Sequence, residues 1–233
     1  LELRDRAAQL DGVLAKTARE GNVNGIKSWI SHGASGGDSK KINIILLCAC
    51  ATSRPACAQM VEAVLPHARD QAVLDDCLRL AAVYGAEETV KCLLRVGTDP
   101  RCTDADGSTP LLTALFANAW DMYVDEWSRA NARRHATSLG NQNIIRMLLR
   151  HGAAVDTRHK DSGKTPLMVA ARYSGFVSLG AVRELLRGGA SLDAVDHKGR
   201  TAEAIARKRL RKPIYDRRRI PERPDLHRRP GAV

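Results

Sequence analysis

The stretch Asp161-Ser-Gly-Lys-Thr-Pro-Leu-Met-Val-Ala-Ala171, followed by Val182-Arg-Glu-Leu-Leu-Arg-Gly-Gly-Ala190, contains the clearest structural signals in this sequence. The hydroxyl group of Thr165 can cap the free amide groups of a helix, and Pro166 fits the first helical position because its missing N–H needs no partner there. Gly189 follows a Leu-Leu pair, where a glycine in the left-handed conformation closes a helix. The stretch therefore predicts a turn, a helix, a loop and a second helix.

The same signals recur along the chain at a regular spacing. The marker glycines at positions 21 and 33 are followed by glycines at 85 and 97, each 64 residues later, which corresponds to two periods of 32. Between them, residues 43–68 contain two apolar helical patterns without the marker glycines and are interpreted as a degenerate repeat. A fixed period of this length predicts an architecture of stacked units.

Two later units are longer than this period. Asp106-Gly-Ser-Thr-Pro-Leu-Leu112 and Ile144-Ile-Arg-Met-Leu-Leu-Arg-His-Gly-Ala153 repeat both halves of the pattern. The glycines at 97, 152 and 189 are spaced by 55 and 37 residues, against a unit of about 33. The surplus predicts an insertion of about residues 117–139 in the fourth unit.

These residues resemble ankyrin repeats over about residues 13–210. The resemblance implies an all-α solenoid of stacked helix-turn-helix units with short finger turns, comprising five repeats and a partial one at residues 196–210. Residues 1–12 form a lead-in, and residues 211–233 form an extended basic tail. The chain departs from the family pattern where Leu112 and Met168 replace the histidine after Thr-Pro-Leu, and where Ala202 replaces the proline after Thr201.

The Leu-Leu pairs are predicted to be structural. A single helix pair cannot bury its apolar face, so neighbouring units stack and share one long core. Burial between helices explains all three pairs, which are Leu93 and Leu94, Leu148 and Leu149, and Leu185 and Leu186.

Composition and motifs argue against several classes of protein. The chain has 233 residues, of which 44% are hydrophobic and 4% aromatic. Its longest apolar run, residues 42–51 with Asn43 inside it, is well short of the roughly 20 residues needed to span a bilayer. The six cysteines lack zinc-site spacing and are expected to be reduced core residues.

One short motif resembles a nucleotide-binding site. Ser162-Gly163-Lys164-Thr165 resembles the end of a phosphate-binding loop, but Arg158 stands where that loop requires glycine. We expect no metal, no cofactor, no small-molecule substrate and no enzymatic activity.

The insertion in the fourth repeat contains an aromatic helical face. Trp120, Tyr123, Val124 and Trp127 have the spacing i, i+3, i+4, i+7, and basic residues follow them. Two interpretations remain open. The face can pack on its own repeat, or it can dock a partner, since Trp, Tyr and Arg are typical contact anchors.

Positive charge is concentrated at the C-terminal end. The net charge is +11, of which residues 207–233 carry +8, from 11 Lys or Arg and three acidic residues, and residues 1–206 carry the remaining +3. A basic tail suits an acidic protein groove or the phosphates of RNA, where each neutralised charge adds salt-sensitive affinity. The candidate contacts are Arg211, Lys212, Arg217, Arg218, Arg219, Arg223, Arg228 and Arg229.

The sequence therefore predicts an intracellular, non-catalytic scaffold, in the cytoplasm or in an organelle such as the mitochondrion. It would bind protein partners in a larger assembly, with the tail docked on an acidic partner. The alternative is a peripheral RNA-contacting component of a ribonucleoprotein particle, such as an organellar ribosome. The candidate partner-binding residues lie in the insertion and the finger turns: Trp120, Tyr123, Trp127, Arg133, Arg134, His159, Lys160, His197 and Lys198.

Overall fold

The computed structural model describes residue 17 and residues 20–31, 39–51, 55–116, 138–172 and 176–210. Within these ranges all regular elements are helices and there is no strand, so the all-α prediction is confirmed there. The elements are α3 (Val23–Ser31), α4 (Ser39–Cys50), α5 (Pro55–Val64), the short 3₁₀ helix η2 (Leu65–His67), α6 (Gln71–Tyr84), α7 (Glu87–Arg95), α8 (Pro110–Phe116), α10 (Ser138–Arg150), α11 (Pro166–Arg172), α12 (Phe176–Arg187) and α13 (Ala202–Leu210).

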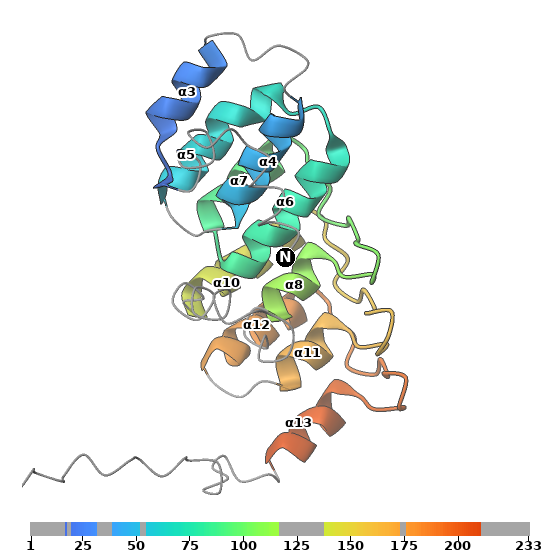
Figure 1. Cartoon of the computed structure of the whole chain (residues 1–233). Coiled ribbons are helices and arrows are strands. Elements are labelled where there is room, and N and C mark those ends of the chain that lie inside the picture. The colour runs from blue at the N-terminus through green and yellow to red at the C-terminus, as the bar shows by residue number, and fades with distance from the viewer. Residues whose placement is uncertain are drawn as a thin grey trace, which may run out of the picture.

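The helices stack in two columns (Figure 1). In the inner column, each helix contacts the next in the order α4, α6, α8, α11, α13. In the outer column, the order is α3, α5, α7, α10, α12. Helix pairs α4 and α5, α6 and α7, α8 and α10, and α11 and α12 link the columns. This arrangement is the stack of helix pairs that the spacing of the marker glycines predicts.

One continuous core runs between the two columns. Its largest members are fully buried aliphatic side chains contributed by nearly every helix, among them Ile26, Ile45, Leu78, Leu93, Leu111, Ile144, Leu148 and Met168. Because each helix pair buries its apolar face only against its neighbours, stability is distributed along the stack.

The predicted helix starts and ends are present. The hydroxyl oxygens of Thr109 and Thr165 accept hydrogen bonds from the backbone N–H groups of Leu112 and Met168, at 3.3 and 3.4 Å. Thr201 caps α13 in the same way, although no proline follows it. Gly152 and Gly189 end α10 and α12 with φ angles of +91° and +86°, which side chains with a Cβ rarely adopt.

The prediction that all three Leu-Leu pairs are buried is wrong at one position. The first leucine of each pair is fully buried. The second changes along the stack: Leu94 is buried, Leu149 is half-buried, and Leu186 keeps 43% of its surface exposed. Leu186 is exposed because α12 is the last helix of the outer column in the described part of the chain.

The six cysteines are free thiols, as expected. Cys50, Cys57, Cys77 and Cys92 are buried, and Cys48 and Cys102 are half-buried. Burial raises the pKa of the Cys50 thiol well above its usual value, and a hydrogen bond with Cys77 adds to the shift. A thiol that stays protonated is a poor nucleophile and a poor metal ligand, so Cys50 acts as an apolar core residue.

Candidate protein-binding surface

Three finger turns precede the inner helices α8, α11 and α13 and line one side of the stack (Figure 1). We call residues 99–108 finger 1, residues 154–164 finger 2 and residues 191–200 finger 3. The backbone of each finger folds back on itself through a short hydrogen-bonded turn. These turns place polar side chains at the edge of the inner column.

Finger 1 is built around Asp104. Its Oδ1 atom accepts hydrogen bonds from the backbone N–H groups of Asp106 and Ser108, at 3.0 and 2.8 Å. Its own N–H donates to the carbonyl oxygen of Ser108, and Gly107, with φ of +74°, completes the turn. The carboxylate thus satisfies two backbone donors that the turn leaves free.

Finger 3 repeats this arrangement around Asp196. Its Oδ1 accepts from the N–H groups of Lys198 and Arg200, both at 2.9 Å. The Arg200 guanidinium also donates to Oδ2, at 3.0 Å from Nε and 2.6 Å from Nη2. The hydrogen bonds from Arg200, together with the backbone N–H groups, lower the pKa of Asp196 to about 2. This carboxylate is therefore charged at neutral pH and holds the finger in shape.

Finger 2 differs from the other two. His159 occupies the position of Asp104 and Asp196, and the turn that it opens is one residue longer, closing on the carbonyl oxygen of Lys164 at 3.0 Å. The histidine ring cannot satisfy two backbone donors as a carboxylate does, and its Nδ1 instead lies 3.5 Å from the Ser162 hydroxyl. The extra residue leaves Lys160 and Asp161 exposed at the tip.

Hydrogen bonds tie finger 3 to finger 2. The His197 N–H donates to the carbonyl oxygen of Ser162 at 3.2 Å, and the His197 Nδ1 atom lies 3.2 Å from the carbonyl oxygen of Asp161. Arg158 donates to the carbonyl oxygen of Val195 at 2.5 Å. The two fingers consequently form one connected surface, and His197 contributes to that connection as well as being exposed.

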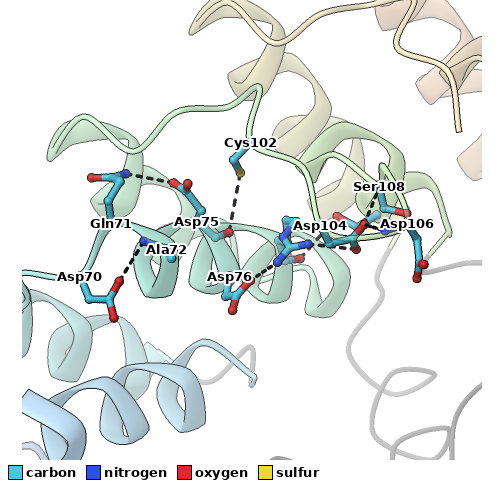
Figure 2. A network of polar contacts seen from close by, with 11 residues as sticks. Asp70, Gln71, Ala72, Asp75, Asp76, Cys102, Asp104, Asp106 and Ser108 are labelled. Carbon is cyan, nitrogen blue, oxygen red and sulfur yellow. Dashed lines mark hydrogen bonds and ion pairs between the residues drawn. The ribbon is translucent and has the colours of Figure 1, made fainter. Parts of the chain in front are cut away.

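Acidic groups gather where finger 1 meets α6 (Figure 2). Arg79 on α6 forms ion pairs with Asp76 on its own helix and with Asp104, the latter at 2.9 Å. Nearby, the Cys102 thiol donates to the carbonyl oxygen of Asp75. Burial and the Asp75 carboxylate raise the pKa of Cys102 to about 12, so the thiol stays neutral. This end is acidic, because five aspartates outnumber the nearby cations Arg79, Arg101 and Lys160, the last of which lies beside Gly107; the aspartates are Asp75, Asp76, Asp99, Asp104 and Asp106.

Basic groups gather at the other end, around fingers 2 and 3. Lys164 is half-buried, and no hydrogen bond or ion pair holds its ammonium group within the described residues. Burial lowers the pKa of Lys164, and the neighbouring charges of Arg172, Arg200 and Lys198 lower it further. Finger 1 with the adjacent part of α6 is therefore acidic, whereas fingers 2 and 3 combine the basic cluster around Lys164 with the carboxylates of Asp156, Asp161, Asp193 and Asp196.

The structure brings together only part of the candidate residues. His159 is half-buried in finger 2, and Lys160, His197 and Lys198 are exposed on neighbouring fingers. The insertion candidates Trp120, Tyr123, Trp127, Arg133 and Arg134 lie outside the described residues, and so do the eight tail candidates from Arg211 to Arg229. Sequence reasoning missed the roles of Arg79, Asp104 and Asp196.

Metal-binding clusters and membrane-spanning helices are both absent from the described residues. Among them, no three His, Cys, Asp or Glu side chains are placed to hold a metal ion. No helix in the same part of the chain has the length and apolar character needed to cross a membrane.

Comparisons with known proteins identify the repeats. The family model "Ankyrin repeats (3 copies)" matches residues 121–196. Rabankyrin-5 from Mus musculus is 30% identical over 129 residues, covering 55% of this chain and 9% of that protein. Neurogenic locus notch homolog protein 1 from Mus musculus is 31% identical over 129 residues, covering 55% and 4%. B-cell lymphoma 3 protein homolog from Mus musculus is 27% identical over 140 residues, covering 54% and 31%.

Residues 121–196 therefore match the ankyrin-repeat family, which confirms the recognition made from the sequence over that range. The chain spans less than a third of the length of each of these relatives. Ankyrin repeats are scaffolds for protein–protein interaction and are generally not enzymatic.

Proposed function

We propose that this chain is a non-catalytic scaffold that binds a protein partner along its fingers and inner column. The observation that supports this most directly is the connected finger surface, in which hydrogen bonds from His197 join the two turns that carry the exposed Lys160 and Lys198. A surface that is already ordered loses little conformational entropy on binding.

The charges of the surface indicate which partner segments fit it. Acidic residues of a bound segment would lie over the basic cluster of Lys164, Arg172 and Lys198, where no hydrogen bond or ion pair holds the Lys164 ammonium group among the described residues. Basic residues of the same segment would lie over Asp99 and Asp106 of finger 1, which is rich in carboxylates. Complementary charge of this kind fixes the direction of a bound segment and speeds association.

Reversing two finger charges is expected to weaken partner binding. In a Lys160→Glu and Lys198→Glu double variant, repulsion of an acidic segment should lower affinity by about tenfold, or about 1.4 kcal/mol. The partner would first be captured by photo-crosslinkers placed at residues 160 and 198, and its affinity would then be measured by titration.

The matched control is Lys27→Glu, an exposed lysine on the outer helix α3. It should leave affinity and melting temperature unchanged. Equal affinities for the finger variant and the control would contradict the proposal.

The alternative, an RNA-contacting component of a ribonucleoprotein particle, has no support in the comparisons. The tail residues on which it rests lie outside the described part of the chain. Photo-crosslinkers placed within residues 211–233 separate the two functions, because crosslinks that disappear after nuclease treatment would indicate RNA and not a protein partner.

A further inference from the structure

The last outer helix of the described chain, α12, has an exposed apolar face. Leu179 and Leu186 keep 58% and 43% of their surfaces exposed. With the half-buried Val182 they line a shallow groove of about 480 Å³, whose other walls are Arg183 and Arg187. We call Leu179, Val182, Arg183 and Leu186 the end face. Helix α12, which carries these residues, lies in the outer column on the side of the stack away from the fingers (Figure 1).

The corresponding face of the preceding outer helix shows what such a surface binds. Counting 37 residues back, from Gly189 to Gly152, the end face corresponds to Gln142, Ile145, Arg146 and Leu149 of α10. These residues are covered by α12 and the residue that follows it: Ile145 is 1% exposed, Gln142 and Arg146 donate hydrogen bonds to Glu184, and Leu149 lies beside Gly188. The end face is thus the position at which the next outer helix of a solenoid would pack.

Charge recognition is part of this packing. Arg146 donates two hydrogen bonds to the Glu184 carboxylate of α12, at 3.1 Å from Nε and 2.9 Å from Nη2. Arg183 occupies the equivalent place on the end face, is exposed, and has no hydrogen bond or ion pair within the described residues. The next helix would therefore be expected to supply a carboxylate at this point.

Glycines allow the close approach of the two helices. A Cβ atom on Gly180 of α12 would lie 2.5 Å from the Gln142 Oε1 atom, and one on Gly188 would lie 3.1 Å from the Leu149 Cδ1 atom. A helix that packs on such a face therefore needs small residues four positions before and four positions after its carboxylate, as Gly180 and Gly188 flank Glu184.

We propose that the end face binds an amphipathic helix of a protein partner, one that places a carboxylate over Arg183 and small and apolar side chains over Leu179, Val182 and Leu186. This goes beyond the proposed function, because it adds a second surface on the other side of the stack. A partner helix would continue the outer column by one position and cover an apolar face that stays open to solvent in the described part of the chain.

Other occupants fit the charges of the end face less well. In an antiparallel dimer, Arg183 and Arg187 would meet the same two arginines, since Glu184 is already bound to Arg146. In a head-to-tail dimer, the equivalent of Glu184 on α3 is Ser28, which carries no charge. Residues 211–233 contain eight Lys or Arg and three acidic residues, so their net charge would be repelled by the two arginines.

A synthetic helical peptide tests the proposal. Its sequence is that of residues 176–189, which carry Glu184 between Gly180 and Gly188. In the peptide, Leu179 is replaced by lysine and Arg183 by glutamate, and the two new side chains are joined as a lactam, which stabilises so short a helix. Leu186 is replaced by glutamine. The fluorescein-labelled peptide is titrated into the full chain, and fluorescence anisotropy reports binding.

We expect the wild-type chain to bind this peptide and the Arg183→Glu variant to bind it at least tenfold more weakly. A Leu179→Ser and Leu186→Ser double variant should lose affinity to a similar extent. A second peptide, with lysine in place of Glu184, should bind the Arg183→Glu variant more tightly than it binds the wild-type chain. All these residues are exposed, so melting temperatures should stay near that of the wild type, and Lys160→Glu on finger 2 is the control that should bind like the wild type.

Four results would overturn the proposal. The first is no binding of the peptide to the wild-type chain up to about 1 mM, and the second is equal affinity of the wild type and the folded Arg183→Glu variant.

The other two results would identify a different occupant. The third is a dimer in sedimentation experiments that the leucine double variant abolishes, which would identify a second copy as the occupant. The fourth is peptide binding that appears only in a full-length Ile214→Asp and Ile220→Asp variant, which would identify the C-terminal segment. Since the finger surface is not involved, failure here leaves the proposed function standing.

Discussion

A Leu148→Ala variant is expected to lose about 3 kcal/mol of unfolding free energy, whereas Leu186→Ala should lose less than about 1 kcal/mol. The two leucines belong to the same Leu-Leu motif in successive repeats. Leu148 is fully buried between the columns, so truncation removes its burial and leaves a cavity. Leu186 already exposes 43% of its surface, so the same truncation removes little.

Urea unfolding of the two variants at pH 7 measures the difference. Both substitutions remove the same atoms from the same motif, so helix propensity changes equally and cancels in the comparison. Similar losses for both variants would show that a helix or segment covers Leu186 in solution.

A Glu184→Gln variant is expected to lose about 2 kcal/mol of unfolding free energy at neutral pH. The Glu184 carboxylate is buried and accepts hydrogen bonds from Arg146, Arg187 and Gln142. The hydrogen bonds from Arg146 are the largest cause of its lowered pKa, which is about 2 against an ordinary value of 4.5, while burial works in the opposite direction. Because the guanidinium groups of both arginines keep contact with solvent, the loss should stay below that of a fully buried pair.

The same group predicts how stability depends on pH. A carboxyl group with a lowered folded-state pKa stabilises the fold fully above the unfolded pKa and loses that contribution as pH falls through the folded pKa. For Glu184 the window runs from about pH 4.5 down to about 2, and for Asp196 from about 3.8 down to about 2. Urea unfolding at a series of pH values should show a flatter acid limb for Glu184→Gln than for wild type. Parallel acid limbs would contradict the assignment.

The sequence predicts most of the fold, because the signals that set it are local. A threonine cap with proline at the first helical position, and a glycine that turns left-handed after a Leu-Leu pair, act within a few residues and do not depend on the rest of the chain. The caps at Thr109 and Thr165 and the glycines at 152 and 189 are therefore present as predicted.

The binding surface depends on contacts between residues far apart in sequence, and these were harder to predict. Asp104 meets Arg79 only because finger 1 returns to the preceding inner helix. One available signal was overlooked, namely an aspartate five residues before both Thr109 and Thr201, with histidine in its place in finger 2. The exposure of Leu186 could not be read from its motif, because burial there depends on the helix that follows.

Packing by neighbours alone has a consequence for how the molecule responds to heat. In the described structure α13 rests chiefly on α11, whereas α6 is held by α4, α7 and α8. A helix with one neighbour can detach without disturbing the rest, while one in the middle must break several interfaces at once. Since α3 likewise rests chiefly on α5, melting should begin as fraying at both ends of the described stack and reach the centre last.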